Sequence, residues 1–397
     1  MSQFYQQLAT LTPAQRALLA QKLAAKGLEQ GLKTHGASAI PSITARDQPL
    51  PLSFAQQRLW FVQQLDPQNT AYNVASVLRL EGALDISALE KSLSALVERH
   101  ETFRTHFELR TDENGQQQPV QVISSPRPVH LEVEACLGVE SQTAVEKKIA
   151  ALTQQPFDLS QPLLRTALLQ VAADSYLLVL TTHHIISDRW SVMVFLREMT
   201  LLYRAFSQGQ LSPLAPLKVQ YADWAVWQRQ QLKGEKLTAQ IDYWQRQLSG
   251  ELPVLDLPFD RSYGAIATYE GSQVPFTLSQ SLSQKLKTLS RDYSTTLFTL
   301  LLTALKVLLH RYTNSDDVVI GSDIANRDRI ETESLIGLLV NTLVFRSDLS
   351  IFPSFCDLLQ QVRDTVLDGL AHKDLPFEKL VEVINPERHL SQMMPLF

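Results

Sequence analysis

The sequence has little of what marks several common protein classes. Its only two cysteines, Cys136 and Cys356, lie far apart, which argues against a disulfide framework and favours a reducing compartment. No apolar run is as long as a membrane span, and no basic segment followed by an apolar core opens the chain. Long basic stretches are also missing, and the net charge of −5 argues against nucleic acid as a partner. We therefore expect a cytoplasmic protein that binds neither membrane nor nucleic acid.

What is present is typical of large globular domains. Hydrophobic residues make up 45% of the chain and charged residues 19%, which is enough for sizeable cores. The 397 residues predict two or three domains, or one duplicated architecture. Residues 1–30 have a helical pattern and are predicted to be a docking or leader segment. Residues 31–50 lack periodicity and are predicted to be a linker. Met1 and this leader favour the start of a polypeptide.

Strand and helix patterns alternate through the rest of the chain, which predicts an α/β fold. Residues 51–220 form a first predicted lobe. Residues 221–397 repeat roughly the same order of elements and form a second, although the two halves are too different to be a sequence repeat. In the second lobe we expect one polar helix over residues 221–248 and a strand over residues 271–278.

The most informative stretch is residues 183–191, which read HHIISDRWS. A buried strand is predicted over residues 176–180, and a helix capped by Ser187 or Asp188 over residues 190–206. Adjacent strand residues point to opposite faces, so only one of His183 and His184 can face a given cleft. A neutral imidazole can take a proton from an amine or alcohol near neutral pH. Two structural histidines are the plain alternative, and a zinc site is disfavoured because no cysteine or glutamate cluster stands nearby.

Six stretches in order resemble the motifs of condensation domains of nonribosomal peptide synthetases, a family of the chloramphenicol-acetyltransferase-like superfamily. They read SFAQQRLWF from Ser53, RHETFRT from Arg99, HHIISDRWS from His183, YADWAVW from Tyr221, IGLLVNTL from Ile336 and HKDLPFE from His372. A seventh begins at Arg388. The resemblance covers residues 51–397, and the chain ends inside the seventh motif, so we expect the second lobe to be incomplete at its C-terminus.

This resemblance implies two chloramphenicol-acetyltransferase-like lobes in a V-shaped pseudo-dimer, with the active site at the lobe junction. It implies an acyltransferase that forms an amide bond. The donor is an acyl or peptidyl thioester on an upstream peptidyl carrier protein, and the acceptor is an aminoacyl thioester on a downstream one. Both arrive on phosphopantetheine arms, and the domain itself binds no cofactor and no metal. An adjacent adenylation domain of the same synthetase is a further expected partner.

The resemblance also suggests roles for individual residues. His184, ahead of His183, is expected to contact the attacking amine. Asp188 is expected to be structural and to pair with an arginine that holds the loop rigid. The candidate arginines are Arg104 and Arg346, of which we favour Arg104.

Two further positions are less certain in role. Asn341 could reach the lobe junction or could simply hold a turn. Arg189 replaces the glycine of the family signature. It could point outward, narrow the acceptor channel, contact an acidic carrier protein, or mark a domain that no longer condenses. We favour an active domain because His183, His184 and Asp188 all remain.

Three alternative functions stay open. The domain could be a starter domain that acylates the first amino acid with a fatty acyl group. It could form esters with a hydroxyl nucleophile. It could also be a non-catalytic module that binds carrier proteins. Heterocyclisation and epimerisation domains are disfavoured by the two histidines and by the position of Trp190 before Ser191.

Overall fold

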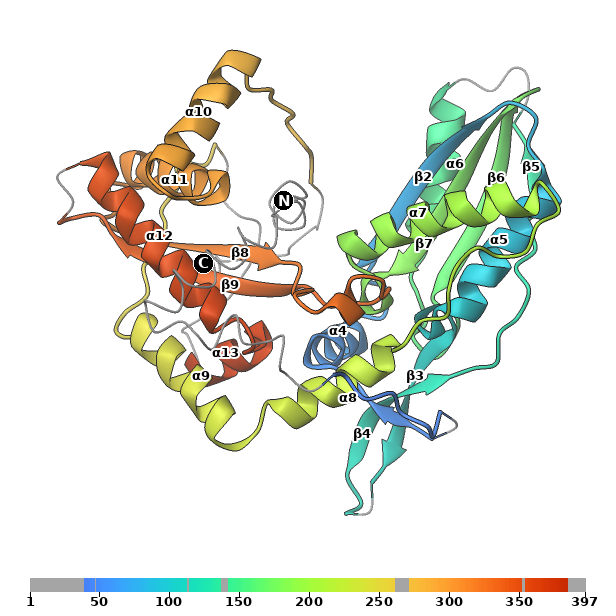
Figure 1. Cartoon of the computed structure of the whole chain (residues 1–397), viewed down its shortest axis with the longest axis horizontal. Helices are drawn as coiled ribbons and strands as arrows, with labels where there is room; N and C mark the ends of the chain where they lie inside the picture. The colour runs from blue at the N-terminus through green and yellow to red at the C-terminus, as the bar shows by residue number, and fades with distance from the viewer. Residues whose placement is uncertain are drawn as a thin grey trace. The chain divides into compact units, whose positions relative to one another are not determined.

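The structure is a computed structural model that describes residues 39–46, 48–112, 114–136, 142–260, 271–351 and 354–384. These residues form two compact units, coloured along the chain in Figure 1. Of the described residues, the N-terminal unit contains those of Ala39–Lys233 and Ala325–Val340, and the C-terminal unit those of Gly234–Ile324 and Asn341–Ile384. The predicted leader (residues 1–30) and the seventh motif lie outside the described residues.

The N-terminal unit is built on a four-stranded sheet in the order β2-β7-β6-β5. Strands β2, β7 and β6 are antiparallel, and β5 runs parallel to β6. A second sheet has the order β1-β4-β3, in which β3 and β4 are antiparallel. The elements are β1 (Leu50–Pro51), α4 (Phe54–Leu65), β2 (Asn73–Glu81), α5 (Ile86–Arg99), β3 (Thr105–Thr111), β4 (Gln117–Ile123), β5 (Val133–Ala135), α6 (Gln142–Thr153), β6 (Leu164–Ala172), β7 (Ser175–His183), α7 (Arg189–Phe206) and α8 (Tyr221–Gln231), with 3-10 turns at Glu101–Arg104, His184–Ile186 and Ile330–Thr332.

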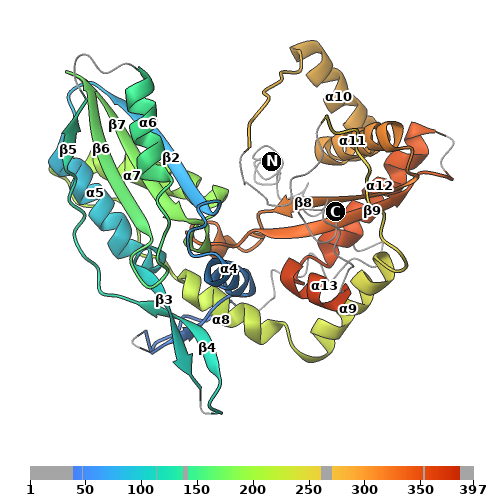
Figure 2. The ribbon, with the colours of Figure 1, turned by 180° about the vertical axis from the view of Figure 1, so that it is seen from behind.

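Helices cover both faces of the four-stranded sheet, so β7 is buried along almost its whole length. Leu178 and Leu180 belong to the core under α5 and α7, whereas Leu177 and Val179 belong to a smaller core under α6. Figures 1 and 2 show α5 and α7 over one face and α6 over the other. Because strand side chains alternate, Thr182 lies on the α7 side of β7.

The N-terminal segment of this unit is packed, although residues 31–50 were predicted to be a linker. Ile40 is buried in a core with Trp224, and the Ile43 N–H donates to Asp223 Oδ1 over 2.7 Å. Arg46 pairs with Asp223 at 2.7 Å, and Leu50 begins strand β1. The buried Asp223 carboxylate therefore fixes this segment, a partner that local composition does not reveal.

The C-terminal unit has a two-stranded antiparallel sheet, β8-β9, that packs against helices. Its core joins Trp244, Phe345, Val362 and Phe377. Lys306 is fully buried and donates to the carbonyls of Val318 and Phe345, one from each strand. The elements are α9 (Gly234–Gln247), α10 (Gln280–Asp292), α11 (Leu297–Thr313), β8 (Asp317–Ile324), β9 (Asn341–Asp348), α12 (Phe355–Ala371) and α13 (Phe377–Ile384).

The observed division of the chain differs from the predicted boundary at residues 220 and 221. Helix α8 stays with the N-terminal unit because Tyr221 and Trp224 pack against Ile40, Leu335 and Leu339. The helix predicted over residues 221–248 is interrupted after Leu232, and Gly234 takes a positive φ of 56° there. A break between α8 and α9 thus coincides with the break between units.

The strand predicted over residues 271–278 is not formed. This segment is extended and exposed, and within the described ranges no strand pairs with it. Alternating apolar residues do not make a strand when no neighbour satisfies the backbone.

One helix pair is notable for its hydropathy. Among the described residues no single helix has the length and apolar character to cross a membrane. Helices α10 and α11 have the length and apolar composition of a membrane span only when they are taken together, and the two helices are bent by 103° relative to each other.

Candidate active site

The stretch around the two histidines forms the strand, turn and helix that the sequence predicts. Strand β7 ends at His183, a single 3-10 turn covers His184–Ile186, and α7 begins at Arg189. The His184 N–H donates to the Tyr72 carbonyl over 2.8 Å, which ties the turn to the loop before β2. Asp188 caps α7 by accepting from the Ser191 N–H at 2.8 Å. The backbone around His184 is thus fixed by the Tyr72 carbonyl at its own N–H and by the capped start of α7 that follows.

The His184 ring is partly exposed and has a defined orientation. Its Nδ1 lies 2.6 Å from the Ser187 carbonyl oxygen. A carbonyl oxygen only accepts, so Nδ1 carries the proton in this hydrogen bond, and in the neutral ring Nε2 is the nitrogen with the lone pair. No residue in the described part of the chain bonds Nε2. The ring therefore presents a hydrogen-bond acceptor, the form needed to take a proton from an amine.

His183 is fully buried, in contrast to its neighbour. Its Nδ1 accepts from the Ile185 N–H at 3.1 Å, and the rings of Tyr72 and Phe157 lie 6.3 and 6.1 Å away. Burial, aided by the adjacent His184, lowers the pKa of His183 from 6.5 to about 4. His183 is therefore neutral at physiological pH and supports the turn from inside the fold.

This burial predicts a dependence of stability on pH. Between pH 6.5 and 4 the unfolded chain binds a proton that folded His183 excludes, so stability rises with pH across this window. We expect His183→Asn, which keeps an acceptor for the Ile185 N–H, to reduce that rise by roughly 3 kcal/mol. Denaturant titrations at several pH values measure it, with exposed His130→Asn as the control. Equal slopes in native protein and His183→Asn would contradict the assignment.

Asp188 is held by Arg327, which corrects the predicted pairing with Arg104 or Arg346. Arg327 Nη2 lies 3.0 and 3.1 Å from the two carboxylate oxygens, and both side chains are buried. Burial and the carboxylate act in opposite directions on the pKa of Arg327, and burial prevails, so this pKa is lowered. Arg327 Nη1 donates to the carbonyls of Thr332 and Leu335 at 2.7 and 2.6 Å. Arg327 therefore joins the start of α7 to the Ala325–Val340 segment.

The two arginines named from the sequence have other partners. Arg104 donates to the Ser124 carbonyl at 2.7 Å, next to Glu101. Arg346 pairs with Asp317 at 2.7 Å across β8 and β9, and donates to the Ser249 carbonyl at 2.6 Å. Both hold local structure away from Asp188. Arg346 belongs to the C-terminal unit.

The segment that carries Arg327 makes further contacts with the loop between β7 and α7. The Leu339 N–H donates to Asp188 Oδ2 at 3.1 Å, and the Gly337 N–H donates to Ser191 Oγ at 3.0 Å. Tyr221 packs over Gly337, and a Cβ at this glycine would lie 1.9 Å from Tyr221 Cδ2. Only glycine fits this close approach. Both oxygens of the Asp188 carboxylate thus have structural partners.

Arg189 occupies the first turn of α7 and is exposed. Its φ is not positive, so its backbone conformation is open to any residue and does not need the glycine of the family signature. Within the ranges that the structure describes, no hydrogen bond or ion pair joins its guanidinium to another residue. Of the roles considered for Arg189, the outward orientation agrees with this placement.

Asn341 lies in the C-terminal unit, where it holds a turn. Its Nδ2 donates to the carbonyls of Lys373 and Leu375, each at 2.9 Å, and its Oδ1 accepts from the Phe377 N–H at 3.0 Å. These bonds occupy both ends of the amide. Asn341 anchors the sixth motif to strand β9.

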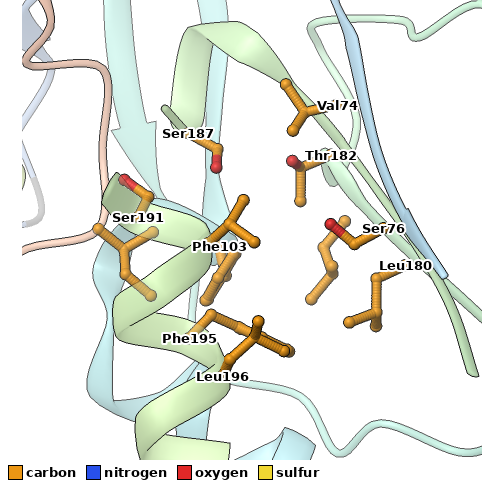
Figure 3. A pocket seen from close by; sticks show the side chains of 12 residues that line it. Val74, Ser76, Phe103, Leu180, Thr182, Ser187, Ser191, Phe195 and Leu196 are labelled. Carbon is orange, nitrogen blue, oxygen red and sulfur yellow. The ribbon is translucent and has the colours of Figure 1, made fainter. Parts of the chain in front are cut away.

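A narrow slot lies between α7 and the sheet, beside the loop between β7 and α7. Figure 3 shows Ser191, Phe195 and Leu196 of α7 facing Thr182 and Leu180 of the sheet. The slot offers about 30 Å³ of free space, room for about two water-sized groups. Its wall is formed by Val74, Ser76, Phe103, Leu164, Leu180, Thr182, Ser187, Ser191, Val192, Phe195, Leu196 and Ile336.

The described side chains offer no metal site. No group of three histidine, cysteine, aspartate or glutamate side chains among them could hold an ion. The residues that the site brings together are His183, His184, Asp188 and Arg327, all in the N-terminal unit.

Comparison with known proteins identifies the family. A family model described as Condensation domain matches residues 46–397. One of the linear gramicidin synthase proteins of Brevibacillus parabrevis is 48% identical over 357 residues, which are 89% of this chain and 7% of that protein. Malpinin synthetase of Mortierella alpina is 42% identical over 367 residues, which are 91% of this chain and 5% of that protein. The chain thus spans only a small part of the length of these relatives.

Two solved structures show the same fold. The X-domain from teicoplanin biosynthesis, in complex with OxyB, is 30% identical with a TM-score of 0.80, covering 91% of this chain and 78% of that one. The first condensation domain of the calcium-dependent antibiotic synthetase, in complex with a substrate analogue, is 23% identical with a TM-score of 0.69, covering 85% and 77%. The predicted α/β class is confirmed, while the V shape stays a prediction. Because the family model matches nearly all of the chain, the chain belongs to the condensation-domain family of nonribosomal peptide synthetases.

Proposed function

We propose that this domain forms an amide bond between an upstream acyl or peptidyl donor and a downstream aminoacyl acceptor. The observation that supports this most directly is the orientation of His184. Its Nδ1–H is held by the Ser187 carbonyl at 2.6 Å, and its Nε2 is left as an acceptor on a partly exposed ring. An acceptor in a fixed position suits a reaction whose nucleophile is an amine.

The reaction follows from this placement. The acceptor nitrogen attacks the donor thioester carbonyl, a C–N bond forms and the C–S bond breaks. The proton lost by the nitrogen passes to His184 Nε2 and from there to the departing thiolate. A neutral amine is already nucleophilic, so holding the two reactants together contributes as much as proton removal. Asp188 and Arg327 serve the reaction indirectly, because they fix the loop that carries His184.

The proposed partners are two peptidyl carrier proteins, one upstream and one downstream, whose phosphopantetheine arms deliver the thioesters. An adenylation domain of the same synthetase is a third. Support comes from the relatives, which are much longer synthetases, and from a four-domain nonribosomal peptide synthetase, 25% of which matches the fold of this chain.

A second candidate is a binding module that recruits another protein without catalysing condensation. The observation that favours it is the TM-score of 0.80 to the teicoplanin X-domain, a protein solved in complex with OxyB. The intact His184 geometry favours the catalytic proposal over this one. Nothing in the slot or the loop supports a starter domain or an ester-forming domain over amide formation.

Single-turnover condensation with a donor-loaded and an acceptor-loaded carrier, followed by mass spectrometry, tests the proposal. We expect product from the native chain, and a rate in Arg189→Gly within about threefold of native, because a surface side chain without partners contributes little. Free thioesters without carriers should react much more slowly. Product only in Arg189→Gly would mean that the arginine silences the site. No product from either protein, with carriers shown to bind, would favour the binding module.

A further inference from the structure

Three hydroxyl groups of the slot have no partner of their own. Ser76, Thr182 and Ser187 line it, and among the described residues none of their side chains makes a hydrogen bond. Thr182 is only 9% exposed and Ser187 only 4%. Figure 3 shows Ser76 and Thr182 on the sheet side of the slot and Ser187 beside Ser191, at the start of α7. None of the three oxygens is among the fully enclosed unpaired polar atoms of the described residues, so each is open to the free space of the slot and free to bond a group that enters it.

The hydroxyl of Ser191, the remaining polar group of the slot, differs from these three because it already has hydrogen-bond partners. Ser191 Oγ lies 2.7 Å from Asp188 Oδ1 and accepts from the Gly337 N–H at 3.0 Å, so it is fully used by the loop. The rest of the lining is mostly apolar and includes Phe103, Leu180 and Phe195. A ligand group here therefore meets hydrocarbon from both the helix and the sheet, with free hydroxyls at Ser76 and Thr182 of the sheet and at Ser187 of the loop before α7.

The slot is short, and it adjoins the reacting loop. Its free space of about 30 Å³ takes about two water-sized groups, which matches the tip of a small side chain and excludes a ring. Ser187 lines the slot and its carbonyl binds His184 Nδ1 at 2.6 Å. Thr182 lies two residues before His184. A substrate held by His184 is thus next to the slot.

We propose that the slot is a specificity pocket for one substrate's side chain, which is short and ends in a hydrogen-bonding group such as a hydroxyl. This proposal rests on the condensation function proposed above. Serine and threonine hydroxyls both donate and accept, so these three groups can serve a hydroxyl or a small amide. The same chemistry can come from the donor or from the acceptor, and the experiment separates the two.

The test compares threonine with valine, which have the same shape but differ by a hydroxyl. Each is loaded in turn on the acceptor carrier with a glycyl donor, and on the donor carrier with a glycyl acceptor. We expect the threonyl substrate to react roughly tenfold faster than the valyl one on one arm and equally fast on the other, the size of one net hydrogen bond. The carrier on which the threonyl substrate reacts faster identifies whether the donor or the acceptor side chain enters the slot.

Matched variants connect the preference to the slot. In Thr182→Val, which keeps the side-chain shape, the preference should fall to about unity. In Thr181→Val, the same change on the opposite face of β7, it should stay as in the native chain. Equal rates for threonine and valine on both arms, or an undiminished preference in Thr182→Val, would show that the slot holds water only.

A binding measurement keeps this inference separate from the catalytic proposal. If native protein makes no product from any pair, the proposed condensation function is wrong. Methyl NMR of the full chain with threonyl- and valyl-pantetheine amides then tests whether the slot binds a hydroxyl-bearing side chain. The threonyl compound should shift the Thr182 methyl signal at a concentration where the valyl compound does not. No difference between the two compounds overturns the pocket.

Discussion

Replacing His184 by alanine should lower the single-turnover condensation rate by roughly a hundred- to ten-thousandfold, the usual contribution of a positioned proton acceptor. The reason is the fixed orientation of the ring: Nδ1–H is held by Ser187 at 2.6 Å, and only Nε2 can meet the nucleophile. Residual product would come from the proximity of the two tethered reactants.

His184→Asn separates the two functions of this ring. An asparagine amide can still donate to the Ser187 carbonyl, as Nδ1 does, but offers nothing at the position of Nε2. Its rate should therefore fall as far as that of alanine, while its unfolding free energy stays closer to native. Carrier affinity, measured separately, should be unchanged in both variants. A rate in His184→Asn within tenfold of native would show that Nε2 takes no part in the reaction.

The second large effect concerns the buried ion pair between Asp188 and Arg327. Arg327→Met should destabilise the N-terminal unit by about 3–5 kcal/mol, because it leaves the Asp188 carboxylate buried and uncompensated. The helix cap, the Leu339 contact and the support for His184 all depend on this carboxylate. Hydrogen exchange of the α7 amides during denaturation follows this unit directly.

Two controls make the result specific. Arg346→Met breaks a partly exposed pair with Asp317 in the C-terminal unit, and should leave exchange in α7 unchanged. Asp188→Asn combined with Arg327→Met should cost clearly less than the two single changes added together, because neither charge is then left alone. Additive costs would show that the two side chains do not act as a pair.

The elements around the loop between β7 and α7 were predictable because their signals are local. The apolar run of β7 and the stripe of α7 place a strand end and a helix start within a few residues of Asp188, a residue type that caps helices. Alternation along β7 also shows that only one histidine can face a given side. It does not say which, and the assignment of His184 came from the family resemblance.

The partner of Asp188 was not predictable in this way. Arg327 is 139 residues away and lies in a polar stretch that has the composition of an exposed loop. Nothing in its local sequence distinguishes it from Arg104 or Arg346. Helix α8 is a similar case, since its packing against Ile40 and Leu335 depends on how distant segments meet. Tertiary contacts, which local patterns do not encode, decide these positions.

The path of the chain has a consequence for biosynthesis. The Ala325–Val340 segment belongs to the N-terminal unit, although the rest of that unit ends at Lys233. A ribosome completes residue 233 several seconds before it reaches the arginine that clamps the loop, at roughly 5–20 residues per second. During that interval the nascent unit carries its histidines on an unclamped loop. The clamp on the loop therefore forms only after much of the C-terminal unit has been made.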